Sequence, residues 1–312
     1  MRVAVLGPGG VGGLLAAVLD RAGSEVTVVA REPTAELIGE RGISVSSVTF
    51  GDFVARPSAV AALEEPVDAL LVATKADGLQ RALERIAAAP GVVLPLLNGL
   101  DHLGPLRERF SAQRVLAGSI RVEADRPAPG VVVHTSPFLL VSMATAHARA
   151  VAAMNELAAA LTAAGVPVRV HEEVSQRSEA DVMWSKLVRL NALACTTSAH
   201  DKLLGEIRST PRLRADLVGA IEEACTVGRA EGALDVEAAK ALDELERAHE
   251  TLGSSMQRDL AAGRPPELDA IPGSVLRAAA RHGLRCPTIE RLVAVIAQRA
   301  GAEPPRSADA AA

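Results

Sequence analysis

Residues 7–12 read Gly7-Pro8-Gly9-Gly10-Val11-Gly12 and match the pattern G-x-G-x-x-G. The motif follows an apolar run, Arg2 to Leu6, that predicts a strand, and it opens a helix predicted over Gly12 to Ala22. Gly7 permits a tight turn, Gly9 lets the backbone approach a pyrophosphate, and Gly12 lets helix and strand pack closely. The stretch therefore predicts a dinucleotide-binding unit in which residues 7–12 bind the cofactor. A purely structural glycine turn is the alternative.

The residues that follow the next two strands bear on which cofactor is bound. Glu25 to Val29 predicts the second strand, and Arg31 lies just beyond it, where folds that prefer NAD usually carry an acidic residue. A planar guanidinium there would bind the 2′-phosphate of NADP, although Glu32 keeps NAD open. Lys75 follows the strand that begins at Ala69, where it either contacts the cofactor or is a solvated lysine. The sequence favours NADP(H).

Further strands and helices alternate through the first half of the chain. Strands are predicted over Ala69–Ala73 and Val92–Leu97, with a helix over Leu79–Ala88 between them, and later strands over Val115–Val122 and Gly130–His134 are expected to extend the same sheet. Such alternation is typical of a doubly wound, mainly parallel α/β sheet. From Ser178 onward the sequence shows helical periodicity and almost no strand signal, with helices expected at 180–197, 216–231, 236–260, 271–282 and 288–299. The prediction is a Rossmann domain over 1–172, an all-α domain over 173–300 and a disordered tail over 301–312.

Composition excludes several classes of protein. The net charge of −5 is dispersed, which disfavours a nucleic-acid partner, and the three cysteines form no C-x-x-C pair. No signal peptide or membrane span is evident, so a cytoplasmic protein with no membrane partner is expected. None of the seven histidines lies in a metal-binding motif, so no metal is expected. The chain has no tyrosine, which excludes catalysis by a phenol.

Taken together, these motifs resemble the ketopantoate reductase (2-dehydropantoate 2-reductase) family along nearly the whole ordered chain. The matching segments, beside the glycine turn and Arg31, are 73–76 (Ala-Thr-Lys-Ala), 97–99 (Leu-Asn-Gly), 184–187 (Trp-Ser-Lys-Leu), 205–208 (Gly-Glu-Ile-Arg), 254–256 (Ser-Ser-Met) and 267–269 (Glu-Leu-Asp). The resemblance implies a soluble enzyme that reduces a small 2-oxo acid with NADPH. The implied substrate is 2-dehydropantoate, reduced to pantoate, or a close analogue.

The resemblance also implies roles for individual residues. Lys186 corresponds to the general acid that protonates the ketone oxygen, and Glu267 to the carboxylate that positions the lysine and the substrate. Asn98 corresponds to an asparagine near nicotinamide and substrate, and Ser255 to a hydroxyl that binds the substrate carboxylate. Arg31 and Lys75 correspond to cofactor-binding positions. Hydride addition builds negative charge on oxygen, which a cation that can release a proton stabilises.

Each of these residues also has a simpler interpretation. Lys186 could extend to solvent and pair with Glu179 or Asp181 on its own helix. Asn98 could be the first residue of an Asn-Gly turn, and Ser255 a capping serine. Glu267 could be a charge at a helix N-terminus.

The substrate pocket departs from the family pattern. The family carries asparagines four and eight positions after the lysine, where this chain has Leu190 and Ala194. Asn191 lies one residue later, about 100° around the helix. Either Asn191 still binds substrate, or the pocket is more apolar and takes another acid. A reductase of an imine or opine-like substrate and a non-catalytic NADP sensor are further alternatives, and the oligomeric state stays open, a homodimer included.

Overall fold

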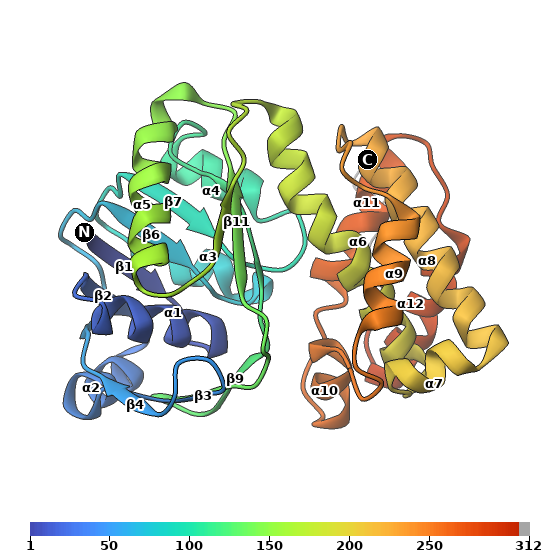
Figure 1. Ribbon diagram of the computed structural model, residues 1–312, viewed down its shortest axis with the longest axis horizontal. Coiled ribbons are helices and arrows are strands. Elements are labelled where there is room, and N and C mark those ends of the chain that lie inside the picture. Colours follow the sequence, from blue (N-terminus) through green and yellow to red (C-terminus); the bar gives the residue numbers. More distant parts are fainter. Residues whose placement is uncertain (306–312) are drawn as a thin grey trace. The chain divides into compact units, whose positions relative to one another are not determined.

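Two compact units make up residues 1–305, the part of the chain that this computed structural model describes (Figure 1). The N-terminal unit contains Met1–Leu97 and His102–Val182, and the helical unit contains Asn98–Asp101 and the chain from Met183 onward. The division falls inside helix α6 (Gln176–His200). Of the tail predicted over 301–312, residues 302–305 have no regular secondary structure, and 306–312 lie outside the described residues.

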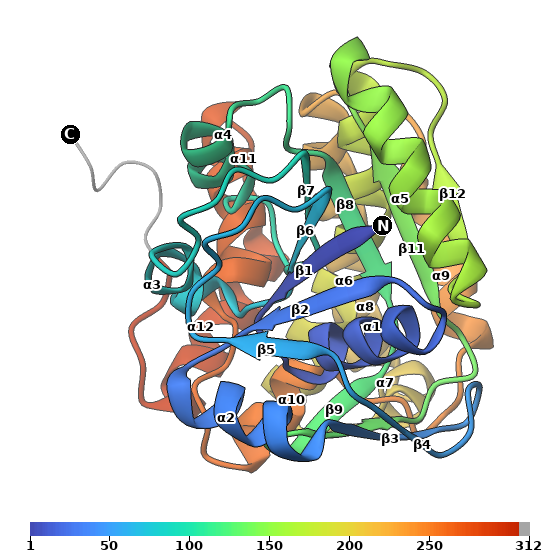
Figure 2. The same ribbon diagram turned by 90° about the vertical axis from the view of Figure 1, so that its left-hand side faces the viewer.

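The N-terminal unit is built on a five-stranded sheet with the order β5-β2-β1-β6-β7, visible in Figure 2. All of its pairings are parallel, which confirms the predicted doubly wound α/β fold. The strands are β1 (Arg2–Leu6), β2 (Glu25–Val29), β5 (Ser58–Val60), β6 (Ala69–Val72) and β7 (Val92–Pro95). Its helices are α1 (Gly10–Arg21), α2 (Glu32–Arg41), α3 (Leu79–Leu83), α4 (Leu103–Phe110) and α5 (Val151–Ala163). Strand order reverses between β1 and β6, where such sheets bind ligands.

Both faces of this sheet are buried because its strands are apolar at successive positions. Val3 and Val5 of β1 lie in one core cluster, which includes side chains of α1, α2 and α5. Ala4 and Leu6 point to the opposite face and lie in a second cluster with residues of α3 and α4. Side chains that alternate between two covered faces explain why the strands read as continuous apolar runs.

Two smaller sheets complete the N-terminal unit. Strand β8 (Ala117–Arg121) continues from β7 through a bridge between Val93 and Val115, and it pairs with β11 (Leu140–Ala144), which pairs with β12 (Val168–Val170). The prediction that Gly130–His134 extends the central sheet is wrong. That segment, β10 (Val131–His134), instead joins a separate sheet with the order β4-β3-β10-β9. The other strands are β3 (Ile43–Ser47), β4 (Phe53–Ala55) and β9 (Ala124–Ala128). A short apolar run does not reveal its partner strand.

His134 is a buried histidine that joins β10 to β3. Ser136 Oγ donates its proton to the Phe138 carbonyl at 2.7 Å, so it must accept from His134 Nε2, 3.3 Å away. Ser47 Oγ accepts from two main-chain N–H groups of the following turn, which leaves its proton for His134 Nδ1 at 2.8 Å. The hydrogen bonds thus fix a neutral ring protonated on Nε2. Burial holds the pKa of His134 below its ordinary value of 6.5.

This lowered pKa makes stability depend on pH. In the unfolded chain His134 takes up a proton near its ordinary pKa, and in the folded protein only at lower pH. As pH falls below about 6.5 the unfolded state binds more protons, so the free energy of unfolding decreases. We expect His134→Gln to reduce this decrease in urea titrations at neutral and mildly acidic pH. His249→Gln, which removes an exposed histidine, is the control. An unchanged pH dependence in His134→Gln would contradict the argument.

An all-α unit was predicted, and from Met183 onward the described residues form the rest of α6 and a series of further helices. They are α7 (Leu204–Ser209), α8 (Pro211–Ala230), α9 (Ala238–Arg247), α10 (Ser255–Ala261), the π-helical turn η3 (Asp269–Gly273), α11 (Ser274–Arg281) and α12 (Pro287–Ala300). The single helix predicted over 236–260 is wrong, because the chain breaks between α9 and α10. Trp184 of α6 is fully buried, and its ring packs so closely on Gly228 of α8 that a Cβ there would lie only 3.1 Å from the indole.

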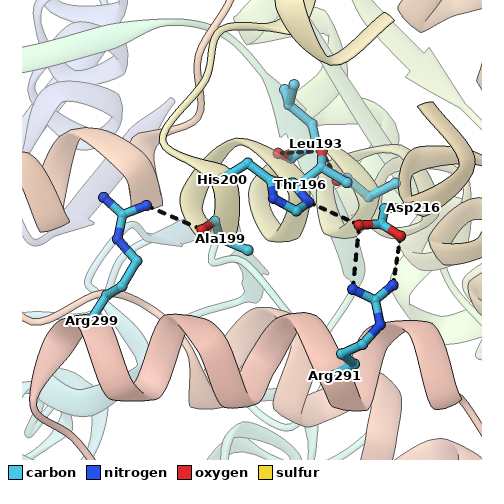
Figure 3. Close-up of polar contacts among 8 residues, drawn as sticks. Leu193, Thr196, Ala199, His200, Asp216, Arg291 and Arg299 are labelled. Carbon is cyan, nitrogen blue, oxygen red and sulfur yellow. Dashed lines mark hydrogen bonds and ion pairs between the residues drawn. The ribbon is translucent and has the colours of Figure 1, made fainter. Parts of the chain in front are cut away.

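A buried carboxylate joins three helices of this unit (Figure 3). Asp216 of α8 accepts from His200 Nε2 at 2.9 Å and from both terminal nitrogens of Arg291 in α12. Arg299, also in α12, donates to the Ser198 and Ala199 carbonyls near the end of α6. Burial alone would raise the pKa of Asp216, but the hydrogen bonds from Arg291 and His200 outweigh it and hold that pKa below its ordinary value. Within residues 1–305, no helix has the length and apolar character needed to cross a membrane.

Candidate functional site

The glycine turn is shaped by close backbone approaches. Gly7 has φ +90°, a region that favours glycine, and α1 begins at Gly10. A Cβ on Gly12 would collide with the Gly7 carbonyl, and one on Gly10 with the Ala124 carbonyl of β9. A Cβ on Gly9 would have no close neighbour, its nearest atom being the Ala73 carbonyl oxygen at 4.0 Å. The open side of the turn therefore lies at Gly9, beside the first N–H groups of α1, as a pyrophosphate requires.

Thr74 and Lys75 come shortly after the end of β6, and Thr74 lies next to the glycine turn. The Thr74 methyl group would be 2.8 Å from a Cβ placed on Gly7, so the two residues are neighbours. Thr74 Oγ1 is buried and has no hydrogen-bond partner within the described residues. A buried hydroxyl without a partner next to the turn is consistent with a polar cofactor. Lys75 is exposed. The sequence prediction singled out Lys75 and passed over Thr74, although Thr74 lies in the matching segment 73–76 and directly follows a buried strand.

Arg31 and Glu32 differ in their surroundings. Arg31 is the exposed N-cap residue of α2, and its side chain has no hydrogen bond or ion pair to another described residue. Glu32 opens α2, and its carboxylate lies 3.8 Å from the Arg85 guanidinium. Arg31 is thus available to an anionic group, whereas Glu32 already has a cation beside it.

Three of the predicted site residues meet in the helical unit. Lys186 Nζ of α6 donates to Asn98 Oδ1 at 2.8 Å, and Asn98 Nδ2 donates to Glu267 Oε2 at 3.0 Å. All three side chains are half-buried. The asparagine amide therefore links an ammonium to a carboxylate. Glu179, one of the partners considered for Lys186, instead accepts from Arg107 and from the Ala146 N–H.

Asn98 reaches this position through the turn that it begins. Gly99 has φ +84°, and a Cβ on it would collide with the Ala270 carbonyl. The turn at 98–101 therefore packs directly on the backbone just after Glu267. The Asn-Gly pair was open to interpretation either as a turn or as a functional site, and here it is a turn that carries a site side chain.

Ser255 and Asn191, the other two predicted substrate-binding residues, make no contact with the Lys186–Asn98–Glu267 group in the hydrogen bonds of the described residues. The serine that caps α10 is Ser254, which accepts from Gln257 N at 3.0 Å and is 2.9 Å from Thr197 Oγ1. Ser255 is part-exposed at the start of α10, and its hydroxyl makes no bond to another described residue. Asn191 has no exposed surface. It lies about 100° around α6 from Leu190 and turns into the core, so this conformation gives no support to its predicted substrate contact.

Two features beside the site were not anticipated. Arg277 of α11 pairs with both Asp101 and Asp269. The only signal in the sequence was that these aspartates closely follow Asn98 and Glu267. The matching segment at 205–208 is structural, because Arg208 donates to three main-chain carbonyls at the end of α9 and the start of the loop after it.

A parallel dinucleotide-binding sheet, together with a helical unit that presents a lysine, an asparagine and a carboxylate, defines a nicotinamide-dependent oxidoreductase acting on C=O and CH–OH groups. The chain belongs to the ketopantoate reductase family. The family model Ketopantoate reductase PanE/ApbA matches residues 3–143, and the model of its C-terminal domain matches residues 178–300.

Individual relatives cover nearly the whole chain. A 2-dehydropantoate 2-reductase from Caulobacter vibrioides is 30% identical over 94% of this chain and 97% of its own length. The crystal structure of a 2-dehydropantoate 2-reductase from Geobacter metallireducens has a TM-score of 0.84 at 26% identity, covering 96% of this chain and 99% of that one. A ternary structure of D-mandelate dehydrogenase with NADH and anilino(oxo)acetate has a TM-score of 0.83 over 96% and 99% of the two chains. At 21% identity that likeness shows the fold alone.

Proposed function

We propose that this protein reduces a 2-oxo acid to the 2-hydroxy acid with NADPH, with Lys186 as the general acid. The observation that carries the proposal is the Lys186–Asn98–Glu267 group, in which a half-buried ammonium is held by an amide next to a carboxylate. The names of the relatives make 2-dehydropantoate the first candidate substrate.

The residues of this group suit a carbonyl reduction. When bound, NADPH would supply the hydride for the ketone carbon. The carbonyl oxygen then gains negative charge, and the Lys186 ammonium stabilises that charge and gives it a proton. Lys186 is left neutral and regains its proton from water. Asn98 Oδ1 accepts one Lys186 N–H and so holds the ammonium in place. Glu267 fixes the Asn98 amide in the orientation that presents its oxygen to the lysine.

The residues of the N-terminal unit fit NADPH. The glycine turn and the first N–H groups of α1 would hold the pyrophosphate, and Thr74 Oγ1 is a buried hydroxyl still lacking a partner among the described residues. Arg31 would bind the 2′-phosphate, because its guanidinium is exposed and makes no bond to a described residue. Glu32, the residue that keeps NAD open, has the Arg85 guanidinium 3.8 Å from its carboxylate, whereas Arg31 has no such partner among the described residues.

The choice among 2-oxo acids depends on the α6 face next to Lys186. Leu190, one turn beyond the lysine, is part-exposed and apolar, and Ala194 is fully buried. Neither can bond a substrate hydroxyl, so this face favours an acid with an apolar side chain over one with a hydroxyl. A reductase of a more apolar oxo acid is therefore the second candidate.

A substrate panel tests the proposal. NADPH oxidation, followed by its near-ultraviolet absorbance, is measured with 2-dehydropantoate, with shorter and longer apolar 2-oxo acids, and with the same acids plus ammonia. We expect turnover of at least one 2-oxo acid without ammonia. Preference for an apolar acid over 2-dehydropantoate would select the second candidate. Turnover only with ammonia would identify an imine reductase, and tight NADPH binding without any turnover would support a sensor, so either result would reject the proposal.

A further inference from the structure

Asn98 and Glu267 lie on two segments that have no regular secondary structure of their own. Asn98 lies in the turn at 98–101, and Glu267 in the stretch between α10 and η3. A short irregular segment can shift by an ångström at little energetic cost. The Asn98 amide, however, must keep its oxygen toward Lys186 and its nitrogen toward Glu267. Something else must therefore hold the two segments in place.

The sequence after Glu267 produces an unusual turn. Pro272 has no N–H, so the Leu268 carbonyl accepts instead from the next residue, Gly273, at 3.1 Å. This bond spans five residues and widens the helix into the π-helical turn η3. The widened turn presents both the carboxylate and the main-chain carbonyl of Asp269 to the helix that follows.

Arg277 of α11 bonds to both segments at once. Its guanidinium donates to Asp101 Oδ2 from Nη2 at 2.6 Å and from Nε at 3.2 Å. It also donates to Asp269 Oδ1 at 2.7 Å and to the Asp269 carbonyl at 2.8 Å. Asp101 is three residues after Asn98, and Asp269 is two residues after Glu267. The planar fork suits such bridging, whereas a lysine offers a single point charge.

These ion pairs are poorly placed to stabilise the fold as a whole. The Asp269 side chain is 75% exposed and that of Asp101 46% exposed, and exposed pairs contribute little to the free energy of unfolding. Their geometry, by contrast, ties the turn at 98–101 to the segment that carries Glu267, and Asn98 and Glu267 are hydrogen-bonded to each other. We infer that Arg277 is a positioning residue for the reduction, which holds Asn98 against Glu267 by bridging Asp101 to Asp269. This inference rests on the proposed function.

The loss of kcat on removing this bridge depends on how far Asn98 and Glu267 move from the positions that the reduction needs. A displacement of about 1 Å in a positioned group can lower a rate by about 100-fold. We therefore expect Arg277→Met to lower kcat by about ten- to a hundred-fold. The apparent pKa on the alkaline side of the kcat–pH profile should also move, because the surroundings of Lys186 change. The thermal midpoint and the Kd of NADPH should stay close to wild type.

The same helix provides a matched control. Arg281 lies one turn further along α11 and pairs with Glu231 at 2.9 Å, so Arg281→Met removes an equivalent ion pair that touches neither segment. Its kcat and pH profile should equal those of wild type. Should Arg277→Met fail to fold, Asp101→Ala and Asp269→Ala each remove one carboxylate of the bridge, and both should lower kcat in the same direction.

A double-mutant cycle with Asn98→Ala separates positioning from general damage. If Arg277 acts through the asparagine, Arg277→Met should lower kcat in the wild-type background but not in Asn98→Ala. An equal loss in both backgrounds, or an unchanged kcat in Arg277→Met, would overturn the inference while leaving the proposed function intact. A wild-type protein that turns over no 2-oxo acid would instead overturn the proposed function, and this inference with it.

Discussion

Replacing Lys186 with alanine is expected to lower kcat for the 2-oxo acid by about 100-fold or more, the range for loss of a general acid. The substitution removes both the proton and the positive charge that the developing oxyanion needs. It leaves the glycine turn and Arg31 untouched, so the Kd of NADPH should change little. Steady-state kinetics with varied substrate, together with calorimetric titration of NADPH, measure the two quantities.

Lys202 provides the comparison for this variant. It lies in the same unit, where it pairs with Glu206 at 2.8 Å on the surface, so Lys202→Ala should leave kcat unchanged. If Lys186→Ala retained turnover within a few-fold of wild type, Lys186 would not be the acid. The proton donor would then have to be sought elsewhere in the site.

Replacing Arg31 with alanine is expected to raise the Kd of NADPH by about ten- to a hundred-fold, the equivalent of losing a charge-assisted hydrogen bond. The Kd of NADH should change much less, because NADH carries no 2′-phosphate. The ratio of the two affinities is therefore the informative quantity. Calorimetric titration of each nucleotide into wild type and variant provides it.

Arg41, exposed in the last turn of the same helix, allows a matched substitution. Arg41→Ala should affect neither nucleotide. If Arg31→Ala lost affinity equally for NADH and NADPH, the proposal that Arg31 binds the 2′-phosphate would be wrong. The arginine would then contact a part of the cofactor that both nucleotides share.

Four of the five strands of the central sheet were predicted from the local sequence, because each carries a buried apolar run, whereas the short and only part-buried β5 was not predicted. β1 and β2 agree with the predicted bounds, since their apolar runs lie between a glycine turn and charged residues. The break at 248–254 was missed because Arg208, distant in sequence, binds the carbonyls where α9 ends. A helical pattern on both sides of such a break gives no sign of it.

The candidate site could be predicted only in part. Lys186, Asn98 and Glu267 were identified by resemblance, and their meeting in space was not derivable, because Asn98 and Glu267 are 169 positions apart. Arg277 itself carried no signal, and the position of Asp101 and Asp269 shortly after Asn98 and Glu267 does not show that one arginine binds both, since that depends on the folded turn at 98–101 and on η3. Nothing in the pattern of α6 showed that Asn191 turns inward; only the packing of the helix decides that.

The burial of Trp184 has a practical consequence. It is the only tryptophan, and the chain has no tyrosine, so nearly all of the protein's intrinsic fluorescence comes from one indole in the helical unit. That indole is 2% exposed and two residues from Lys186. The N-terminal unit contributes almost no emission of its own. An emission spectrum thus reports on the helical unit alone, whereas circular dichroism averages over both.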